Sequence, residues 1–408
     1  MPKRGAANQP AKPANQGAKP GRDFLVSPSA QRVEADVPRL EVPRDEDDWR
    51  YAQSFDVDDE GAAAFYRTFG FVVFRGVLDE AETEASRQDI LSYVQSICPD
   101  FRADDTATWT AWKSKVFGTP NVGDSSAIWR KQLVRNRHHP RVAAGFATAL
   151  GCEAPSLLCN HDRWAFYRLG ERTRRNVHLD INPWQYYAHE GARVRAAFAA
   201  ADFRSHEALF KQNNCITRAL GPHAQGTLAL SDNQAEDAGF LCVPGSHAVF
   251  DEWVEALGPE PAHESGFRYD YADHSHLPKI AQRVPVREGS MIVWDARLVH
   301  GSAPDQSPAG AECRARFVQM VALRPRSMWE GTGQAQARAA LVRRMLAVHG
   351  LEEPKEPLQR ALLGLGDERG GGRPQQAPMA AVMDDQQAAA AAGTGDGSPS
   401  RQVRATTI

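Results

Sequence analysis

Several features that define other classes of protein are missing from this chain of 408 residues. No apolar run approaches the roughly 20 residues of a membrane span. The formal net charge is only −3, and no basic stretch is long enough to form a nucleic-acid-binding face. We therefore expect neither a membrane nor a nucleic acid as partner.

Cysteine is scarce and never occurs as a C-x-x-C pair. Six scattered cysteines argue against a structural zinc site and a disulfide framework, and they suit a reducing compartment. The basic amino terminus "MPKRGAANQPAKPANQGAKPGRD" lacks the apolar segment of a secretory signal, and the final "ATTI" is not a peroxisomal address. These features predict a cytoplasmic location and leave the oligomeric state open.

Two catalytic motifs are also absent. There is no glycine-rich phosphate loop and no G-x-S-x-G elbow, so nucleotide hydrolysis and serine-hydrolase chemistry have no support.

Composition divides the chain into a disordered tail over 1–38, a folded domain over 39–365 and a second disordered tail over 366–408. Within the domain we expect a helical part over 39–160, a β core over 161–326 and closing helices over 327–365.

Short strands separated by turn residues dominate the predicted core. They are "WAFYRL", "NVHLDI", "GTLALS", "GFLCVPG", "SMIVWDA" and "RFVQMVAL". Upstream, a strand is predicted over Phe71–Phe74, followed by a helix with Asp79 as its N-cap. The pattern indicates a mainly β protein with flanking helices, built as an antiparallel barrel or a jelly roll.

The stretch "RRNVHLDINPWQYY" places His178 and Asp180 one residue apart on a predicted strand. Residues i and i+2 share one face of a strand, so both side chains can reach a single ion. A second strand, in "REGSMIVWDARLVHGSAP", leads to His300 at its rim. Two histidines and one carboxylate leave about three coordination positions open, which is the arrangement of non-haem Fe(II) oxygenases.

The next strand, "CRARFVQMVALRP", carries Arg314 and Arg316 on one face. A guanidinium group there can bind a carboxylate through two parallel hydrogen bonds. In a ferrous oxygenase that carboxylate belongs to 2-oxoglutarate. The alternative is a solvated strand that happens to carry two arginines.

The order of these motifs resembles the phytanoyl-CoA dioxygenase family of Fe(II)/2-oxoglutarate-dependent oxygenases. The resemblance covers about residues 60 to 345. Its motifs are "GFVVFRGVLDEAE", "HLD", "GTLALSDNQAEDAGFLCVPGSH", "GSMIVWDARLVHGSAP" and "RFVQMVALRP". It implies a double-stranded β-helix, a jelly-roll or cupin-like core, with His178, Asp180 and His300 as iron ligands.

The resemblance also assigns co-substrate residues. Arg316 matches the arginine that binds 2-oxoglutarate, and Arg314 is the runner-up because the gap from the distal histidine is longer than usual. Ser302 matches a position that hydrogen-bonds the co-substrate. Trp184 falls where some members place an aromatic wall beside the iron, although a core tryptophan is an equal alternative. The long segment over 185–222 is expected to be a lid or a surface insertion.

The function implied is hydroxylation of an unactivated C–H bond of a small molecule by Fe(II), 2-oxoglutarate and O₂, with 2-oxoglutarate decarboxylated to succinate. A carboxylate at Asp180 favours hydroxylation over halogenation. Two alternatives remain: a catalytically inactive jelly roll that binds a ligand, and a metal-dependent hydrolase using the same His/Asp/His set. No residue identifies the substrate.

Overall fold

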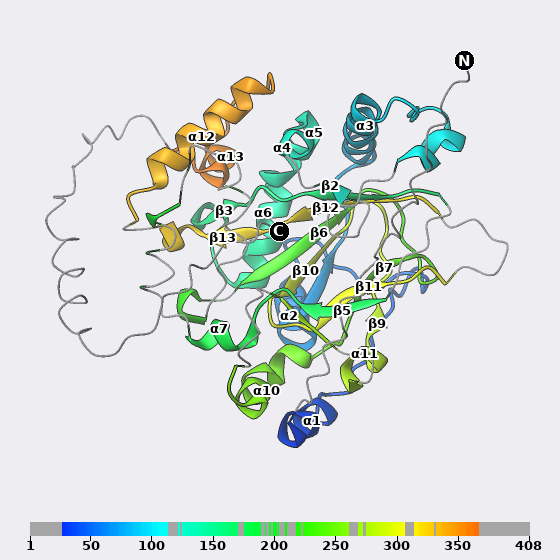
Figure 1. Cartoon of the computed structure of the whole chain (residues 1–408), viewed down its shortest axis with the longest axis vertical. Coiled ribbons are helices and arrows are strands. Elements are labelled where there is room, and N and C mark those ends of the chain that lie inside the picture. Colours follow the sequence, from blue (N-terminus) through cyan, green and yellow to red (C-terminus); the bar gives the residue numbers. More distant parts are fainter. Residues whose placement is uncertain are drawn as a thin grey trace, which may run out of the picture.

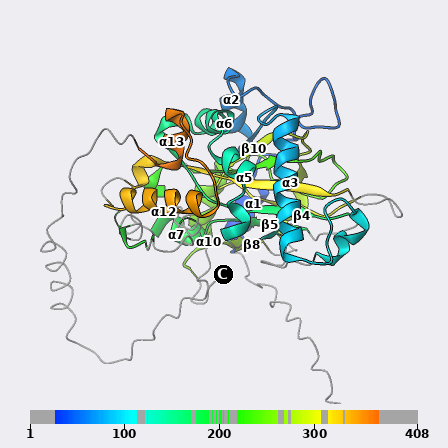
Figure 2. The same ribbon diagram turned by 90° about the horizontal axis from the view of Figure 1, so that it is seen from above.

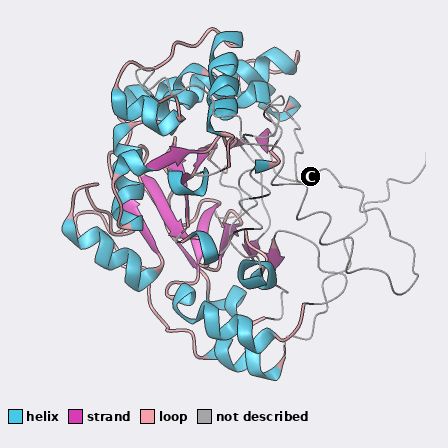
Figure 3. Cartoon of the chain, turned by 90° about the vertical axis from the view of Figure 1, so that its left-hand side faces the viewer, coloured by secondary structure: helices cyan, strands magenta, loops and turns pink. Residues whose placement is uncertain are grey.

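Two antiparallel sheets lie at the centre of the molecule, and helices cover their outer sides (Figure 1, Figure 3). The computed structural model describes residues 27–112, 121–122, 125–169, 175–188, 218–221, 223–260, 268–271, 275–306, 314–329 and 332–366, with a few residues between 192 and 209. The larger sheet has the order β1 (Phe71–Phe74), β10 (Met291–Asp295), β6 (Ala224–Ala229), β12 (Arg316–Val321), β4 (Trp164–Tyr167) and β2 (Asn121–Val122). The smaller sheet has the order β8 (Tyr269–Asp270), β5 (Asn176–Leu179), β11 (His300–Ala303), β7 (Gly239–Cys242) and β9 (Gln282–Arg283).

Neighbouring strands in both sheets come from distant parts of the chain, as expected for a jelly roll. The two sheets pack face to face through Phe240 of β7, whose ring centroid lies 4.6 Å from that of Trp294 on β10. A short third sheet pairs β13 (Leu323–Pro325) with β3 (Leu157–Cys159). The predicted mainly β, jelly-roll fold is confirmed.

Helices cover the outer sides of both sheets. In Figure 1, α3, α5, α12 and α13 lie above the strands, and α1, α10 and α11 lie below them. Figure 2 views this upper side from above, with α12 at the left and α3 to the right of the centre. The helices are α1 (Pro28–Ala35), α2 (Glu60–Phe69), α3 (Glu80–Ile97), α4 (Ser125–Ile128), α5 (Lys131–Arg137), α6 (Pro140–Leu150), α7 (Pro183–Ala188), α10 (Phe250–Leu257), α11 (His276–Ile280), α12 (Ala335–Val348) and α13 (Pro357–Leu363). Short 3-10 turns are η1 (Thr106–Ala111), η2 (Ala154–Ser156), η4 (Arg218–Leu220), η5 (Ser246–Val249) and η6 (Arg326–Trp329).

Successive residues of β12 point alternately to the two faces of the larger sheet. Phe317 and Val321 belong to the large hydrophobic core that also includes residues of the covering helices. Val318 and Met320 instead pack with Ala165 on the opposite face of the sheet. This face looks toward the smaller sheet, and it includes the first residue of the strand, Arg316.

Local sequence signals explain the elements at the start of the domain. Asp79 caps α3 in a capping box, in which its side chain accepts from the Glu82 amide and the Glu82 side chain accepts from the Asp79 amide. Gly70 ends α2 with a φ of 77°, a left-handed conformation that favours glycine. The strand that follows is Phe71–Phe74, as predicted.

The folded part of the chain begins earlier than predicted. The predicted disordered tail over 1–38 contains α1, because Ala30 and Val33 are buried in the hydrophobic cluster outside the smaller sheet. Within the predicted helical part over 39–160, the predicted strand is β1, which pairs with β10 in the larger sheet. Residues 1–26 and 367–408 lie outside the described residues, as does most of 185–222. Within the described parts of the chain, no helix has the length and apolarity that a membrane crossing needs.

Candidate metal centre

Strands β5 and β11 place two histidines side by side. His178 and His300 are direct partners in the antiparallel ladder, and their ring centroids lie 4.6 Å apart. Val177 and Leu179 on β5 pack into the outer cluster, so the histidine between them points to the inner face. Asp180 follows at the end of β5.

The three side chains meet at their ligand atoms. Nε2 of His178 lies 3.3 Å from Oδ1 of Asp180, and Nε2 of His300 lies 3.5 Å from Oδ2. All three ligand atoms lie within 4.8 Å of one another, close enough to hold one ion, and no other such group of at least three His, Cys, Asp or Glu residues occurs in the described parts of the chain. The two carboxylate oxygens each face one imidazole.

The second nitrogen of each imidazole is engaged by a fixed partner. Nδ1 of His300 lies 2.9 Å from the carbonyl oxygen of Leu298, which only accepts, so this nitrogen carries the proton and Nε2 keeps its lone pair. Nδ1 of His178 lies 3.0 Å from Oδ1 of Asn176. Arg268 donates to the same Asn176 oxygen at 2.6 Å, which fixes that oxygen as an acceptor. Both Nε2 atoms are thereby directed at Asp180 as ligands.

The protonation states of the ligand side chains also favour the binding of a metal cation. Burial lowers the pKa of His178 to about 4, so its imidazole is neutral at neutral pH. Burial acts to raise the pKa of Asp180, but His178 and His300 outweigh it and hold that pKa well below its usual range. Gln225 on β6 donates from Nε2 to Oδ2 of Asp180 at 3.1 Å, which orients the carboxylate. Neutral imidazoles and an ionised carboxylate are the forms that bind a divalent metal.

A fourth protein ligand is not supplied by the nearest cysteine. Cys242 on β7 pairs with His300 on the other side of β11. Burial raises the pKa of its thiol, and its sulfur is not among the ligand atoms that converge on the site. Two nitrogens and one carboxylate leave coordination positions open, so the donor set fits an Fe(II) site of the facial type and not a closed structural zinc site.

The two arginines predicted for the co-substrate have different surroundings. Arg316 begins β12 opposite Tyr167, with its guanidinium carbon 5.1 Å from the centroid of that ring. Burial lowers its pKa, and no carboxylate among the described residues lies within ion-pair distance of it. Arg314 is exposed and forms ion pairs with Glu236 at 2.9 Å and Asp237 at 3.2 Å. Of the two, only Arg316 therefore offers a guanidinium group that is at least half-buried and has no carboxylate partner among the described residues.

The remaining two predicted residues lie on opposite faces of the smaller sheet. Ser302 is half-buried on β11, two residues after His300 and on the same inner face. Trp184 is on α7, where its Nε1 donates to the Gly258 carbonyl at 2.8 Å and its ring packs near Tyr269. It is half-buried and packs against the hydrophobic cluster outside the smaller sheet.

Comparison with known proteins gives the family. The model of the phytanoyl-CoA dioxygenase (PhyH) family matches residues 66–313. The chain belongs to this family. A curated Dictyostelium discoideum protein named for phytanoyl-CoA dioxygenase is 30% identical over 271 residues, which are 64% of this chain and 74% of the relative. The predicted family is confirmed, and with it the class of iron- and 2-oxoglutarate-dependent oxygenases.

Solved structures are similar at lower identity. The epimerase SnoN, in complex with Fe3+, alpha ketoglutarate and nogalamycin RO, is 18% identical, with 65% of this chain and 82% of that chain covered and a TM-score of 0.38. EctD from S. alaskensis in its apoform is 15% identical, with 73% and 87% covered and a TM-score of 0.40. Scores of this size carry no argument about the site.

The residues around the ligands were not predicted from the sequence. Asn176 had a local signal, since it lies two residues before His178 on the same face of the strand. No local sequence signal pointed to Gln225 or Arg268, because they reach the site from other segments of the chain, β6 and the start of β8.

Proposed function

We propose that the protein is an Fe(II)- and 2-oxoglutarate-dependent dioxygenase that hydroxylates an unactivated C–H bond of a small molecule, with 2-oxoglutarate decarboxylated to succinate. The observation that carries this proposal is the convergence of His178, Asp180 and His300 on one point, with no fourth His, Cys, Asp or Glu ligand among the residues that the structure describes. When bound there, Fe(II) with 2-oxoglutarate and O₂ supplies the oxidation of the substrate C–H bond.

The chain's own residues hold and orient the reactants. His178, Asp180 and His300 would hold the iron, and Asn176 and Gln225 fix the first two of them. These contacts fix the ligands before the metal arrives, so little ordering remains to be done on binding.

Arg316 would bind the distal carboxylate of 2-oxoglutarate, with Ser302 as a hydrogen-bond donor. An anion beside Arg316 would offset the cost of burying its guanidinium group without a carboxylate partner. Arg314 is a poorer candidate because Glu236 and Asp237 already neutralise it. A metal-dependent hydrolase has no need for such an arginine.

The test is an anaerobic titration of the protein with Fe(II) and then with 2-oxoglutarate, monitored by the visible iron-to-ligand charge-transfer band. We expect the band in the wild type and its loss in Asp180→Ala. Arg316→Ala should need about 10- to 100-fold more 2-oxoglutarate, since a charge-assisted hydrogen bond contributes about 1.5–3 kcal/mol. Arg314→Ala is the matched control and should titrate as the wild type does.

Other outcomes separate the alternatives. A wild type that binds neither Fe(II) nor 2-oxoglutarate would leave the inactive binding protein as the working function. Binding of the metal without 2-oxoglutarate would favour the hydrolase. Formation of succinate from 2-oxoglutarate under O₂, absent in Asp180→Ala, would establish the oxygenase activity before the substrate is known.

A further inference from the structure

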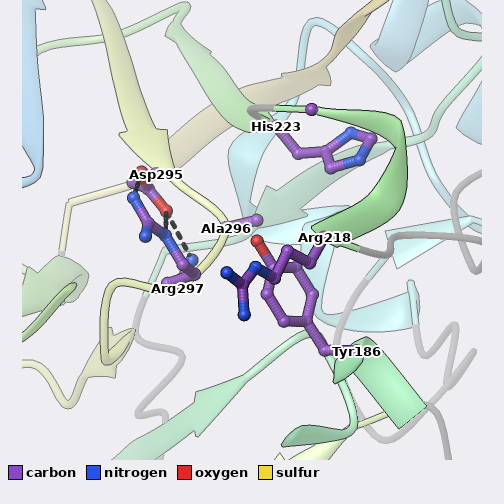
Figure 4. A pocket seen from close by; sticks show the side chains of 7 residues that line it. Tyr186, Arg218, His223, Asp295, Ala296 and Arg297 are labelled. Atoms are coloured by element: carbon purple, nitrogen blue, oxygen red, sulfur yellow. Dashed lines mark hydrogen bonds and ion pairs between the residues drawn. The ribbon is translucent and has the colours of Figure 1, made fainter. Parts of the chain in front are cut away.

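A small pocket adjoins the metal-bearing end of the barrel. Its volume is about 200 Å³, and its walls include Tyr186, Arg218, His223, Asp295 and Arg297 (Figure 4). A pocket that encloses a whole drug-sized ligand has about 300–1,000 Å³. This one has room for a single functional group of a larger molecule.

The walls of the pocket belong to the segments that carry the metal centre. Tyr186 lies on α7, which begins three residues after Asp180. Arg297 lies three residues before His300 in the β10–β11 connection. His223 precedes Gln225 by two residues, and Gln225 donates to Asp180 at 3.1 Å. Two strand residues span about 7 Å, so this wall lies on the order of 10 Å from the ligand carboxylate.

The charges of the pocket do not cancel. Arg297 closes a bidentate pair on Asp295, with Nε and Nη2 at 2.9 and 2.8 Å from the two carboxylate oxygens. Arg218 lies over the ring of Tyr187, with its guanidinium carbon 5.3 Å from the ring centroid. No carboxylate among the described residues lies within ion-pair distance of Arg218. Among the residues that line the pocket, two guanidinium groups and one carboxylate leave one positive charge.

The geometry directs this charge into the pocket. Figure 4 shows the guanidinium group of Arg218 pointing across the hollow toward the Asp295–Arg297 pair, with the ring of Tyr186 beside it. The surrounding acidic group on α10, Asp251, accepts a hydrogen bond from the Tyr187 hydroxyl. The planar fork of an arginine matches the oxygens of a carboxylate or a phosphate.

We propose that this pocket binds an anionic group of the substrate, a carboxylate or a phosphate monoester, with Arg218 as its main partner. The inference deepens the proposed function and rests on it for the identity of the reaction. The substrate is then a small organic anion that is held by its charged group in the pocket. Its oxidised carbon lies on the order of 10 Å away, toward the metal.

The test uses three probes that share one ring: phenylacetate, phenyl phosphate and the neutral phenylacetamide. Their dissociation constants are measured by titration calorimetry on the full chain. The variants are Arg218→Gln, Arg218→Lys and Arg135→Gln. Arg135 is an exposed arginine on α5 and serves as the surface control. Thermal midpoints confirm that each variant is folded.

We expect at least one anion to bind the wild type, with a dissociation constant at least about ten-fold higher in Arg218→Gln. Arg218→Lys should retain part of the affinity, because it keeps the charge and loses the fork. Arg135→Gln should bind as the wild type does. The anion that binds more tightly distinguishes a carboxylate substrate from a phosphate.

Three results would overturn the inference: no binding of either anion at millimolar concentration, equal binding of phenylacetamide, or unchanged binding by Arg218→Gln. The same titration in Asp180→Ala separates this inference from the proposed function. Anion binding that depends on Arg218 but survives in Asp180→Ala places the pocket outside the metal centre. A failed charge-transfer titration would then refute the oxygenase and leave the anion site standing.

Discussion

Replacing Gly301 by alanine should disrupt the metal centre without changing a ligand. Gly301 lies on β11 between His300 and Ser302, opposite Val177 of β5. A Cβ atom there would lie 1.6 Å from the carbonyl oxygen of Asn176 and 2.6 Å from its carbonyl carbon. Both are backbone atoms, so no side-chain rotation relieves the clash.

The size of the required shift follows from these distances. Real Cβ atoms essentially never approach closer than 3.0 Å, so β5 and β11 must separate locally by about 1.4 Å, the difference between 3.0 and 1.6 Å. His178 lies two residues further along the same strand and moves with it. Metal–ligand distances tolerate about 0.2 Å. We therefore expect the Fe(II) dissociation constant to rise by about 100-fold or more, with a loss of about 1–3 kcal/mol in the free energy of unfolding.

The assay is anaerobic calorimetric titration with Fe(II), paired with urea unfolding monitored by circular dichroism. Gly61→Ala is the matched control, because its Cβ in the first turn of α2 would meet only side-chain atoms, of the Asp59 carboxylate at 3.1 Å and of the Phe55 ring at 3.5 Å. That variant should keep wild-type metal affinity and change stability by less than about 1 kcal/mol. Wild-type metal affinity in Gly301→Ala would refute the assignment of the β5–β11 pair as the ligand scaffold.

Three further predictions concern contacts around the centre and in the core. Gln225→Leu removes the donor to Asp180 and should raise the Fe(II) dissociation constant about ten-fold by calorimetry. Gln319→Ala should lower the free energy of unfolding in urea by about 1–3 kcal/mol. It removes one of the two acceptors of the buried Asn136 amide, of which Ser86 is the other, and the donor to the Leu133 carbonyl. Burial lowers the pKa of His138 to about 4 from a usual 6.5, so its contribution to stability is complete above pH 6.5 and is lost toward pH 4. Urea unfolding should show little change from this group between pH 7.5 and 6.5. Below about pH 6 it should show a decline that approaches about 1.4 kcal/mol per pH unit, and a smaller decline in His138→Gln.

Period-two alternation made the centre of the site predictable from the sequence. His178 and Asp180 share a face because alternate residues of any strand do, and the outward packing of Val177 and Leu179 agrees with that pattern. The strand Phe71–Phe74 was predictable for a related reason, since turn residues bound a short apolar run. Both inferences use only neighbours in the sequence.

The alternating pattern of a strand could not distinguish residues that differ only in the partners they contact from distant parts of the chain. Arg314 and Arg316 have the same parity on one strand, but Glu236 and Asp237 from the β6–β7 connection engage only the first. Trp184 likewise takes its position from Gly258, beyond α10. Which loop approaches a side chain depends on sheet order, and neither periodicity nor spacing encodes that order.

The predicted boundary at residue 38 was misplaced for the same reason, since distant parts of the chain decide whether the preceding segment folds. Two truncations can test this. Residues 27–38 have the composition of a tail, yet Val33 and Val37 are buried against the smaller sheet, and Glu34 accepts hydrogen bonds from Trp253 and Ser275. Burying two valines contributes roughly 3 kcal/mol, and ordering the helix offsets part of it. A chain that starts at residue 27 should unfold in urea as the full chain does, and one that starts at residue 39 should lose about 1–3 kcal/mol. Equal stability of the two truncated chains would mean that α1 adds no net stability, and that the boundary at residue 38 is the correct one for the folded unit.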